Sequence, residues 1–225
     1  MPRTLRPDEW APVDVLEMEP AAEEAVRAAA NTVVVAGPGA GKTELLAQRA
    51  CYLLQTGLCP APRRILAISF KRDAARNLGD RVARRCEPGL ARRFDSRTFD
   101  AFAKSLLDRF GRGLPPRWRP SDDYKVSFDI KEKKAAEHLN IIPNRPSLTK
   151  ADIAGIRPIE FYRNHFVGRL PLDDGPTTVE ERASLALWAI YLRGHKPSTL
   201  NFEMINRLAE LLLRANPKIV AAIRA

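Results

Sequence analysis

The chain has 225 residues, of which 45% are hydrophobic and 28% are charged, and its net charge is +10. These values are typical of a soluble globular protein, and no apolar run is long enough to span a bilayer. The N-terminus, with Pro2, Pro7 and Pro12, lacks the apolar stretch of a secretory signal. The odd count of three cysteines and the scattered histidines predict neither a disulfide framework nor a metal site. We therefore expect a cytoplasmic protein with no membrane partner.

The first predicted elements form a strand, a loop and a helix. We expect an irregular leader over residues 1–19 and a short helix over 20–31, in which Pro20 suits the first turn. The β-branched run Thr32–Ala36 then predicts a buried strand. A glycine-rich loop follows it, and residues 42–55 are expected to form the next helix.

The alternation of strand and helix continues along the chain. A second apolar run, Ile65–Ser69, precedes a helical stretch over 72–85. A third round is expected from a strand over 94–97 and a helix over 98–110. Since such alternation implies parallel strands joined by crossover helices, the pattern predicts an α/β fold.

The second half of the chain shows no strong strand signal. Helices are expected near 148–165, near 178–193 and near 201–214. Thr178 and Glu181 have the spacing of a capping box at the start of the second of these helices. We therefore expect a helical second region.

The glycine-rich loop has the composition of a phosphate-binding loop. It comprises Ala36, Gly37, Pro38, Gly39, Ala40, Gly41, Lys42 and Thr43, and Glu44, which follows it, is a further candidate nucleotide-binding residue. Small residues free consecutive backbone N–H groups to converge on phosphate oxygens at the positive end of the next helix. Lys42 would place its ammonium against the β- and γ-phosphates, and the Thr43 hydroxyl would coordinate Mg²⁺. The alternative is a chance glycine-rich turn, but the expected strand and helix on either side favour a nucleotide-binding loop.

The positive charge is concentrated in one quarter of the sequence. Residues 63–119 contain 16 lysines and arginines against 6 aspartates and glutamates, which accounts for the whole net charge of +10. A concentrated positive field favours a polyanionic partner, because neutralising phosphates releases condensed counterions. A solvated basic surface is the alternative interpretation.

Three segments in this order resemble known helicase motifs. The loop at 36–43 resembles motif I of the UvrD/Rep-like superfamily 1 DNA helicases, Ile65–Ala75 resembles motif Ia, and Thr98–Phe102 resembles the Thr-Phe-x-x-Phe motif that follows. Leu200–Ile205 and the helix after it more weakly resemble a later segment of the family. The resemblance implies a P-loop NTPase, recA-like parallel sheet with helices on both faces, ATP and Mg²⁺ as cofactors, and single-stranded DNA as a partner.

In the resembled family, the second and third motifs line the track for single-stranded DNA. The resemblance therefore makes Phe70, Thr98 and Phe102 candidate DNA-binding residues, with Lys71 and Arg72 as phosphate contacts. Aromatic rings can stack on bases while cations hold the backbone, without sequence preference. Each phenylalanine could equally fill the core.

The resemblance also predicts a division into subdomains. Residues 20–111 would form a recA-like 1A core with the phosphate loop, and residues 112–199 would form a helical 1B-like insertion. Residues 200–225 would be helices that return to the 1A core.

Several positions depart from the family pattern. Ala22 stands where the family has its adenine-reading glutamine, and Asp100 replaces the usual histidine of the third motif. Hydrolysis needs a carboxylate at the end of a buried strand to hold Mg²⁺, and the family's Asp-Glu pair would follow shortly after Ala225. The pairs Asp122–Asp123 and Asp173–Asp174 do not follow a clean apolar strand.

Three hypotheses follow. The first is the N-terminal, ATP- and single-stranded-DNA-binding part of a UvrD/Rep-like DNA helicase, incomplete for hydrolysis in the sequence given. Its Walker B carboxylates and arginine fingers would come from the remainder of the helicase or from a partner protein. The second is a complete nucleotide- and DNA-binding partner that does not hydrolyse ATP, and the third is another P-loop NTPase or a kinase.

Overall fold

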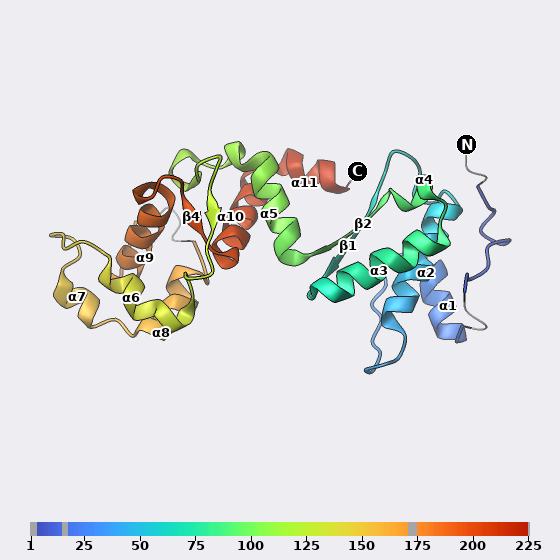
Figure 1. Cartoon of the computed structure of the whole chain (residues 1–225), viewed down its shortest axis with the longest axis horizontal. Helices are drawn as coiled ribbons and strands as arrows, with labels where there is room; N and C mark the ends of the chain where they lie inside the picture. The colour runs from blue at the N-terminus through green and yellow to red at the C-terminus, as the bar shows by residue number, and fades with distance from the viewer. Residues whose placement is uncertain (1–3, 15–17, 171–174, 225) are drawn as a thin grey trace. The chain divides into compact units, whose positions relative to one another are not determined.

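The computed structural model describes residues 4–14, 18–170 and 175–224. Contacts divide the chain into two compact units, of which the first ends at Phe102 and the second begins at Ala103 (Figure 1). The elements up to the boundary are α1 (Pro20–Arg27), α2 (Lys42–Gln55), β1 (Ile65–Ser69), α3 (Arg72–Arg85), α4 (Pro88–Ala91), β2 (Phe94–Thr98) and α5 (Phe99–Phe110), whose sequence crosses it.

The core of the first unit forms where α1 and α3 pack against α2. The buried side chains are mainly aliphatic, with one tryptophan, one tyrosine and two cysteines. They are Trp10, Val26, Leu45, Ala47, Ala50, Cys51, Tyr52, Leu54, Leu78, Val82 and Cys86. Because α2 supplies most of them, this helix holds the glycine-rich loop at its N-terminus on a packed base.

A parallel pair of strands completes the first unit. Ile65 of β1 aligns with Phe94 of β2, and Ser69 aligns with Thr98 at the other end. The α3 helix packs on one face of the pair, where the Ser96 hydroxyl donates a hydrogen bond of 2.8 Å to the Ala75 carbonyl oxygen. The parallel pairing with a crossover helix is therefore confirmed. On the opposite face of β1, Leu66 and Ile68 are exposed.

The N-terminal segment 4–14 lies on α2 without regular structure. The Trp10 ring is buried, meets the Tyr52 ring edge-on at 5.2 Å, and donates a hydrogen bond of 2.6 Å to the Gln55 side chain. Arg27 covers the rings of both Trp10 and Tyr52 at 5.4 and 5.7 Å. This part of the leader is therefore part of the core, which its sequence does not indicate.

Residues 32–36, expected to form a buried strand, do not form one. Their backbone is irregular, and the Val33 and Val35 side chains are 89% and 94% exposed. A strand needs neighbouring strands to pair with its backbone, and in the described part of the chain none pairs with this segment. The prediction of a buried strand here is wrong for this structure, since composition shows only that the segment suits a sheet. The helix before it is also shorter than expected, ending at Arg27.

The second unit is mostly helical, as expected. Its helices after α5 are α6 (Ala135–Asn140), α7 (Lys150–Ala154), α8 (Pro158–Phe161), α9 (Val179–Ala189), α10 (Phe202–Ala215) and α11 (Pro217–Arg224). Short 3₁₀ turns cover Gly111–Gly113, Pro116–Trp118 and Glu132–Lys134, and π-helical turns cover Tyr162–Phe166 and Ile190–Gly194. Two strands, β3 (Lys125–Val126) and β4 (Thr199–Leu200), pair in parallel.

The capping box expected before α9 is confirmed. The Thr178 side chain accepts a hydrogen bond from the Glu181 N–H at 3.2 Å, and the Glu181 carboxylate accepts one from the Thr178 N–H. Contacts group α10 and α11 with the second unit. The boundaries of the 1A and 1B subdomains stay predictions.

Candidate nucleotide-binding loop and nucleic-acid interface

The glycine-rich loop turns sharply at two glycines before it enters α2. Gly39 has a φ of 78° and Gly41 a φ of 69°, a region that residues with a Cβ atom rarely adopt. The Gly41 N–H donates to the Gly39 carbonyl oxygen at 2.8 Å, and Gly41 is the N-cap of α2. An added Cβ would have no neighbour within 4 Å at either position, so glycine serves the backbone conformation rather than close packing.

Lys42 folds back over this loop. Its ammonium donates hydrogen bonds to the carbonyl oxygens of Ala36 at 2.8 Å and of Gly37 at 2.5 Å. The cation of the first residue of α2 thus lies against the carbonyl groups at the start of the loop. A phosphate at this point would meet the cation and the positive end of the helix together. Thr43 follows in the first turn and is half-buried.

Glu44 is engaged with α3 in this structure. Its carboxylate pairs with Arg81, pairs with Arg85 at 3.1 Å, and accepts a hydrogen bond of 2.9 Å from Gln48. The Arg85 side chain also lies 3.6 Å from the Asp14 carboxylate. The first turn of α2 is therefore held to α3 by ion pairs, and the predicted role of Glu44 at the nucleotide stays a prediction.

Gln48 fixes the N-terminal segment one turn further along α2. Its buried amide donates to the Val13 carbonyl oxygen at 2.6 Å and accepts from the Val13 N–H at 3.2 Å. The paired bonds satisfy both backbone groups of one residue. Sequence reasoning missed this contact, because no local pattern relates residues 35 positions apart.

The candidate DNA-binding residues gather at one end of the strand pair. Phe70 directly follows β1 and is 96% exposed, and the exposed Lys71 and Arg72 begin α3. Thr98 ends β2 at the same end, because Ser69 and Thr98 are aligned across the pair. The two motifs, distant in sequence, are thus brought together by parallel pairing.

Thr98 directly precedes α5, and Phe102 lies in its first turn. The Thr98 hydroxyl accepts a hydrogen bond of 3.2 Å from the Ala101 N–H, as an N-terminal cap does. Phe102 is half-buried, whereas Phe99 is exposed. Of the two candidate phenylalanines, Phe70 is therefore the one with an exposed ring, and it lies next to Lys71 and Arg72 in the sequence.

Two acidic pairs in the sequence could have supplied the Walker B carboxylates, and the structure describes one of them, Asp122–Asp123. Asp122 pairs with Arg112 at 2.6 Å on the surface of the second unit, and the neighbouring Asp123 is exposed. Asp173 and Asp174 lie outside the described residues. Within the described ranges, no three His, Cys, Asp or Glu side chains are grouped as a metal site would require, and no helix is both long and apolar enough to cross a membrane.

A glycine-rich loop with lysine and threonine at the start of the following helix is typical of the P-loop class of proteins, and it is present here without the strand that was expected before it. Comparison with protein families is more specific: the UvrD/REP helicase N-terminal domain matches residues 18–224. The chain therefore belongs to the UvrD/REP helicase N-terminal domain family, which implies a P-loop helicase fold.

Individual relatives agree with the family. The chain is 39% identical over 82 residues to the ATP-dependent DNA helicase PcrA of Leuconostoc citreum, which is 36% of this chain and 11% of the relative. It is 29% identical over 178 residues to a probable DNA helicase II homolog of Mycoplasma genitalium, which is 77% of this chain and 22% of that protein. DNA helicase IV of Escherichia coli is 33% identical over 85 residues. The chain thus spans less than a quarter of the length of the relatives that it matches.

Proposed function

We propose that this chain is the N-terminal ATP- and single-stranded-DNA-binding part of an ATP-dependent UvrD/Rep-like DNA helicase. The observation that carries the proposal is the loop itself, in which two left-handed glycines, Lys42 and Thr43 meet at the start of a long helix. Family membership over residues 18–224 supports ATP and Mg²⁺ as the ligands. Lys42 would hold the β- and γ-phosphates, and Thr43 would offer its hydroxyl to Mg²⁺.

The DNA half of the proposal rests on the end of the strand pair. Phe70 offers an exposed ring for base stacking, and Lys71 and Arg72 offer positive charge beside it. The proposed fold is a recA-like 1A core around α2, β1, α3 and β2, with a 1B-like insertion in the second unit. The carboxylates and arginines for hydrolysis would come from the remainder of the helicase or from a partner protein, so this chain alone is expected to turn ATP over poorly or not at all.

The test measures both ligands on the same chain. A fluorescent ATP analogue with Mg²⁺ and a labelled oligo-dT are titrated separately into the parent protein, Lys42→Ala and the control Lys125→Ala, which removes an exposed lysine of β3. We expect Lys42→Ala to abolish nucleotide binding and to leave DNA binding intact, while Lys125→Ala retains both. Nucleotide affinity equal to the parent's in Lys42→Ala would refute the loop assignment. Acceptor-dependent phosphate transfer without any response to DNA would favour a kinase.

A further inference from the structure

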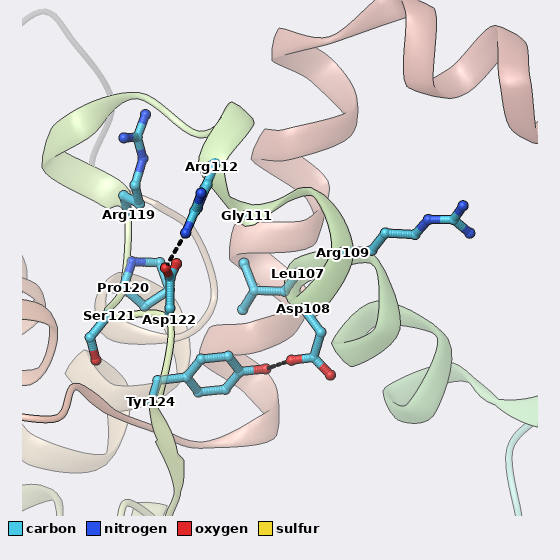
Figure 2. Close-up of a pocket in the computed structure, with 10 residues that line it drawn as sticks. All are labelled: Leu107, Asp108, Arg109, Gly111, Arg112, Arg119, Pro120, Ser121, Asp122 and Tyr124. Atoms are coloured by element: carbon cyan, nitrogen blue, oxygen red, sulfur yellow. Dashed lines mark hydrogen bonds and ion pairs between the residues drawn. The ribbon is translucent and has the colours of Figure 1, made fainter.

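The second unit contains a polar hollow of about 350 Å³ at the C-terminal end of α5. One wall runs from Leu107, near the end of α5, to Arg112 in the 3₁₀ turn that follows, and the other is the segment from Arg119 to Tyr124. Figure 2 shows a side chain crossing between the walls at each end: Arg112 reaches Asp122, and Tyr124 reaches Asp108. The hollow lies wholly within the second unit.

The two crossing contacts differ in how firmly they are held. Asp108 accepts hydrogen bonds from the Tyr124 hydroxyl at 2.6 Å and from the Lys104 ammonium at 3.0 and 2.8 Å. Its negative charge is therefore balanced by Lys104, whose ammonium also lies 5.2 Å from the centre of the Tyr124 ring. At this end of the hollow, Asp108 is therefore bonded to both Lys104 and Tyr124.

The other end is an exposed ion pair. The Arg112 and Asp122 side chains are 83% and 70% exposed, and 2.6 Å separates their charged atoms. Such a pair contributes little stability, because water competes for both charges. Arg119 lines the same wall as Asp122, where its guanidinium donates a hydrogen bond of 3.0 Å to the Leu114 carbonyl oxygen. After Arg112, it is a further positive charge that lowers the pKa of Asp122. The Asp122 carboxylate is thus paired with one guanidinium group and lies within the electric field of a second.

We propose that Arg112 and Arg119 form a binding site for a backbone phosphate of single-stranded DNA, and that Asp122 is an internal anion which the phosphate displaces. The proposal rests on the proposed function, to which it adds a DNA contact outside the helicase motifs. A phosphodiester carries the same single negative charge as the carboxylate, and a guanidinium can hold it through two parallel N–H groups. Once displaced, the Asp122 carboxylate can be hydrated, because it is already exposed to solvent.

The experiment compares neighbouring residues that carry equal charge. Asp122→Asn and Asp123→Asn each remove one negative charge, but Asp123 does not line the hollow. We expect Asp122→Asn to raise the affinity for oligo-dT about 2- to 5-fold more than Asp123→Asn does, which corresponds to the loss of one exposed competing pair. Equal effects of the two substitutions, or weaker binding by Asp122→Asn, would overturn the proposal.

A second comparison tests the arginines. Arg112→Gln and Arg119→Gln should each reduce the slope of log affinity against log salt by about 0.7, the value for one phosphate on a single strand. Arg117→Gln is the matched control, since this arginine packs over the Trp118 ring 5.5 Å away and does not line the hollow. An equal loss of slope in all three variants would show a general effect of charge and refute the site. Thermal denaturation of each variant checks that these surface changes leave the fold intact.

The outcomes separate this inference from the proposed function. If the parent chain binds no single-stranded DNA, the DNA half of the proposed function fails and the inference fails with it. If the chain binds DNA and the matched substitutions behave alike, only the inference fails. Saturable shifts of the Asp122 amide signal with inorganic phosphate, but not with oligo-dT, would assign the hollow to a small anion and overturn the DNA contact.

Discussion

The ammonium of Lys42 lies 2.8 Å from the carbonyl oxygen of Ala36, six residues earlier in the chain. This contact closes the glycine-rich loop on itself and depends on the left-handed turns at Gly39 and Gly41. The charge that would bind a triphosphate is thus held by the loop that would surround it.

Replacement of Gly41 by alanine should therefore weaken nucleotide binding. A left-handed conformation costs an L-residue about 1–2 kcal/mol, which corresponds to about 5- to 30-fold in affinity. The control is Gly89→Ala in α4, where φ is not positive and no atom lies within 4 Å of the added Cβ. Titration with an ATP analogue checks the prediction, and unchanged affinity of Gly41→Ala would show that the loop does not need this turn.

Phe70→Ala should weaken DNA binding without affecting stability. Stacking of a base on an aromatic ring contributes about 1–3 kcal/mol, so the affinity for oligo-dT should fall about 5- to 150-fold. Because the Phe70 ring is almost fully exposed, the thermal midpoint should stay the same. Phe128→Ala, which removes an exposed ring of the second unit, should leave the affinity for DNA unchanged. An equal loss of affinity in both variants would instead indicate nonspecific hydrophobic contact with DNA.

Single-strand binding should depend steeply on salt. About six phosphate contacts from the basic region would give a slope near −4 in log affinity against log salt, or about a 300-fold loss between 50 and 200 mM. Fluorescence anisotropy with oligo-dT over this range measures the slope. A flat response would remove the electrostatic basis of the DNA interface.

Gln48→Ala should destabilise the first unit. The substitution leaves the N–H and the carbonyl of Val13, which belongs to the N-terminal segment, without their partners. Such a loss costs about 1–3 kcal/mol. Urea denaturation followed by circular dichroism measures the change. Asn77→Ala, on the exposed face of α3, is the control and should stay within about 0.5 kcal/mol of the parent.

The second unit should lose stability on mild acidification through His138. Burial lowers the pKa of this imidazole below its ordinary value of 6.5, and its Nδ1 lies 2.8 Å from the Tyr191 hydroxyl. Below pH 6.5 the His138 imidazole is protonated in the unfolded chain, whereas in the folded chain it stays neutral until the pH falls further. The free energy of unfolding is therefore highest above pH 6.5 and falls as the pH drops toward the lowered pKa.

Urea midpoints at pH 7.5 and 5.5 measure this effect, and His138→Gln should show a smaller difference between the two. An equal pH dependence in the parent and in the variant would assign it to other groups.

Local sequence signals predicted much of the fold. The ranges of α2, β1 and α3 are confirmed to the residue, because apolar periodicity and helix-breaking glycines act over short distances. The capping box at Thr178 is confirmed for the same reason. The two motifs with the candidate DNA-binding residues were also found from sequence, and parallel pairing explains why they meet.

Apart from the early end of α1 at Arg27, the misses involve distant partners. Trp10 and Gln48 join the core through contacts 35 or more residues away, and the parallel pair of β3 and β4 links residues more than 70 positions apart. Residues 32–36 have the composition of a strand, yet a strand exists only where another pairs with it. The Arg112–Asp122 pair is likewise a product of folding, since the sequence shows only scattered charges.

The exposed valines at 33 and 35 have a practical consequence for handling the purified chain. A β-branched, apolar segment with unpaired backbone groups is a template for pairing with a second molecule. The segment leads directly into the glycine-rich loop, so self-association at high concentration would compete with nucleotide for access to the same region. Binding experiments are therefore best made at low micromolar protein concentration, and Val35→Lys is a solubilising change that leaves every loop residue in place.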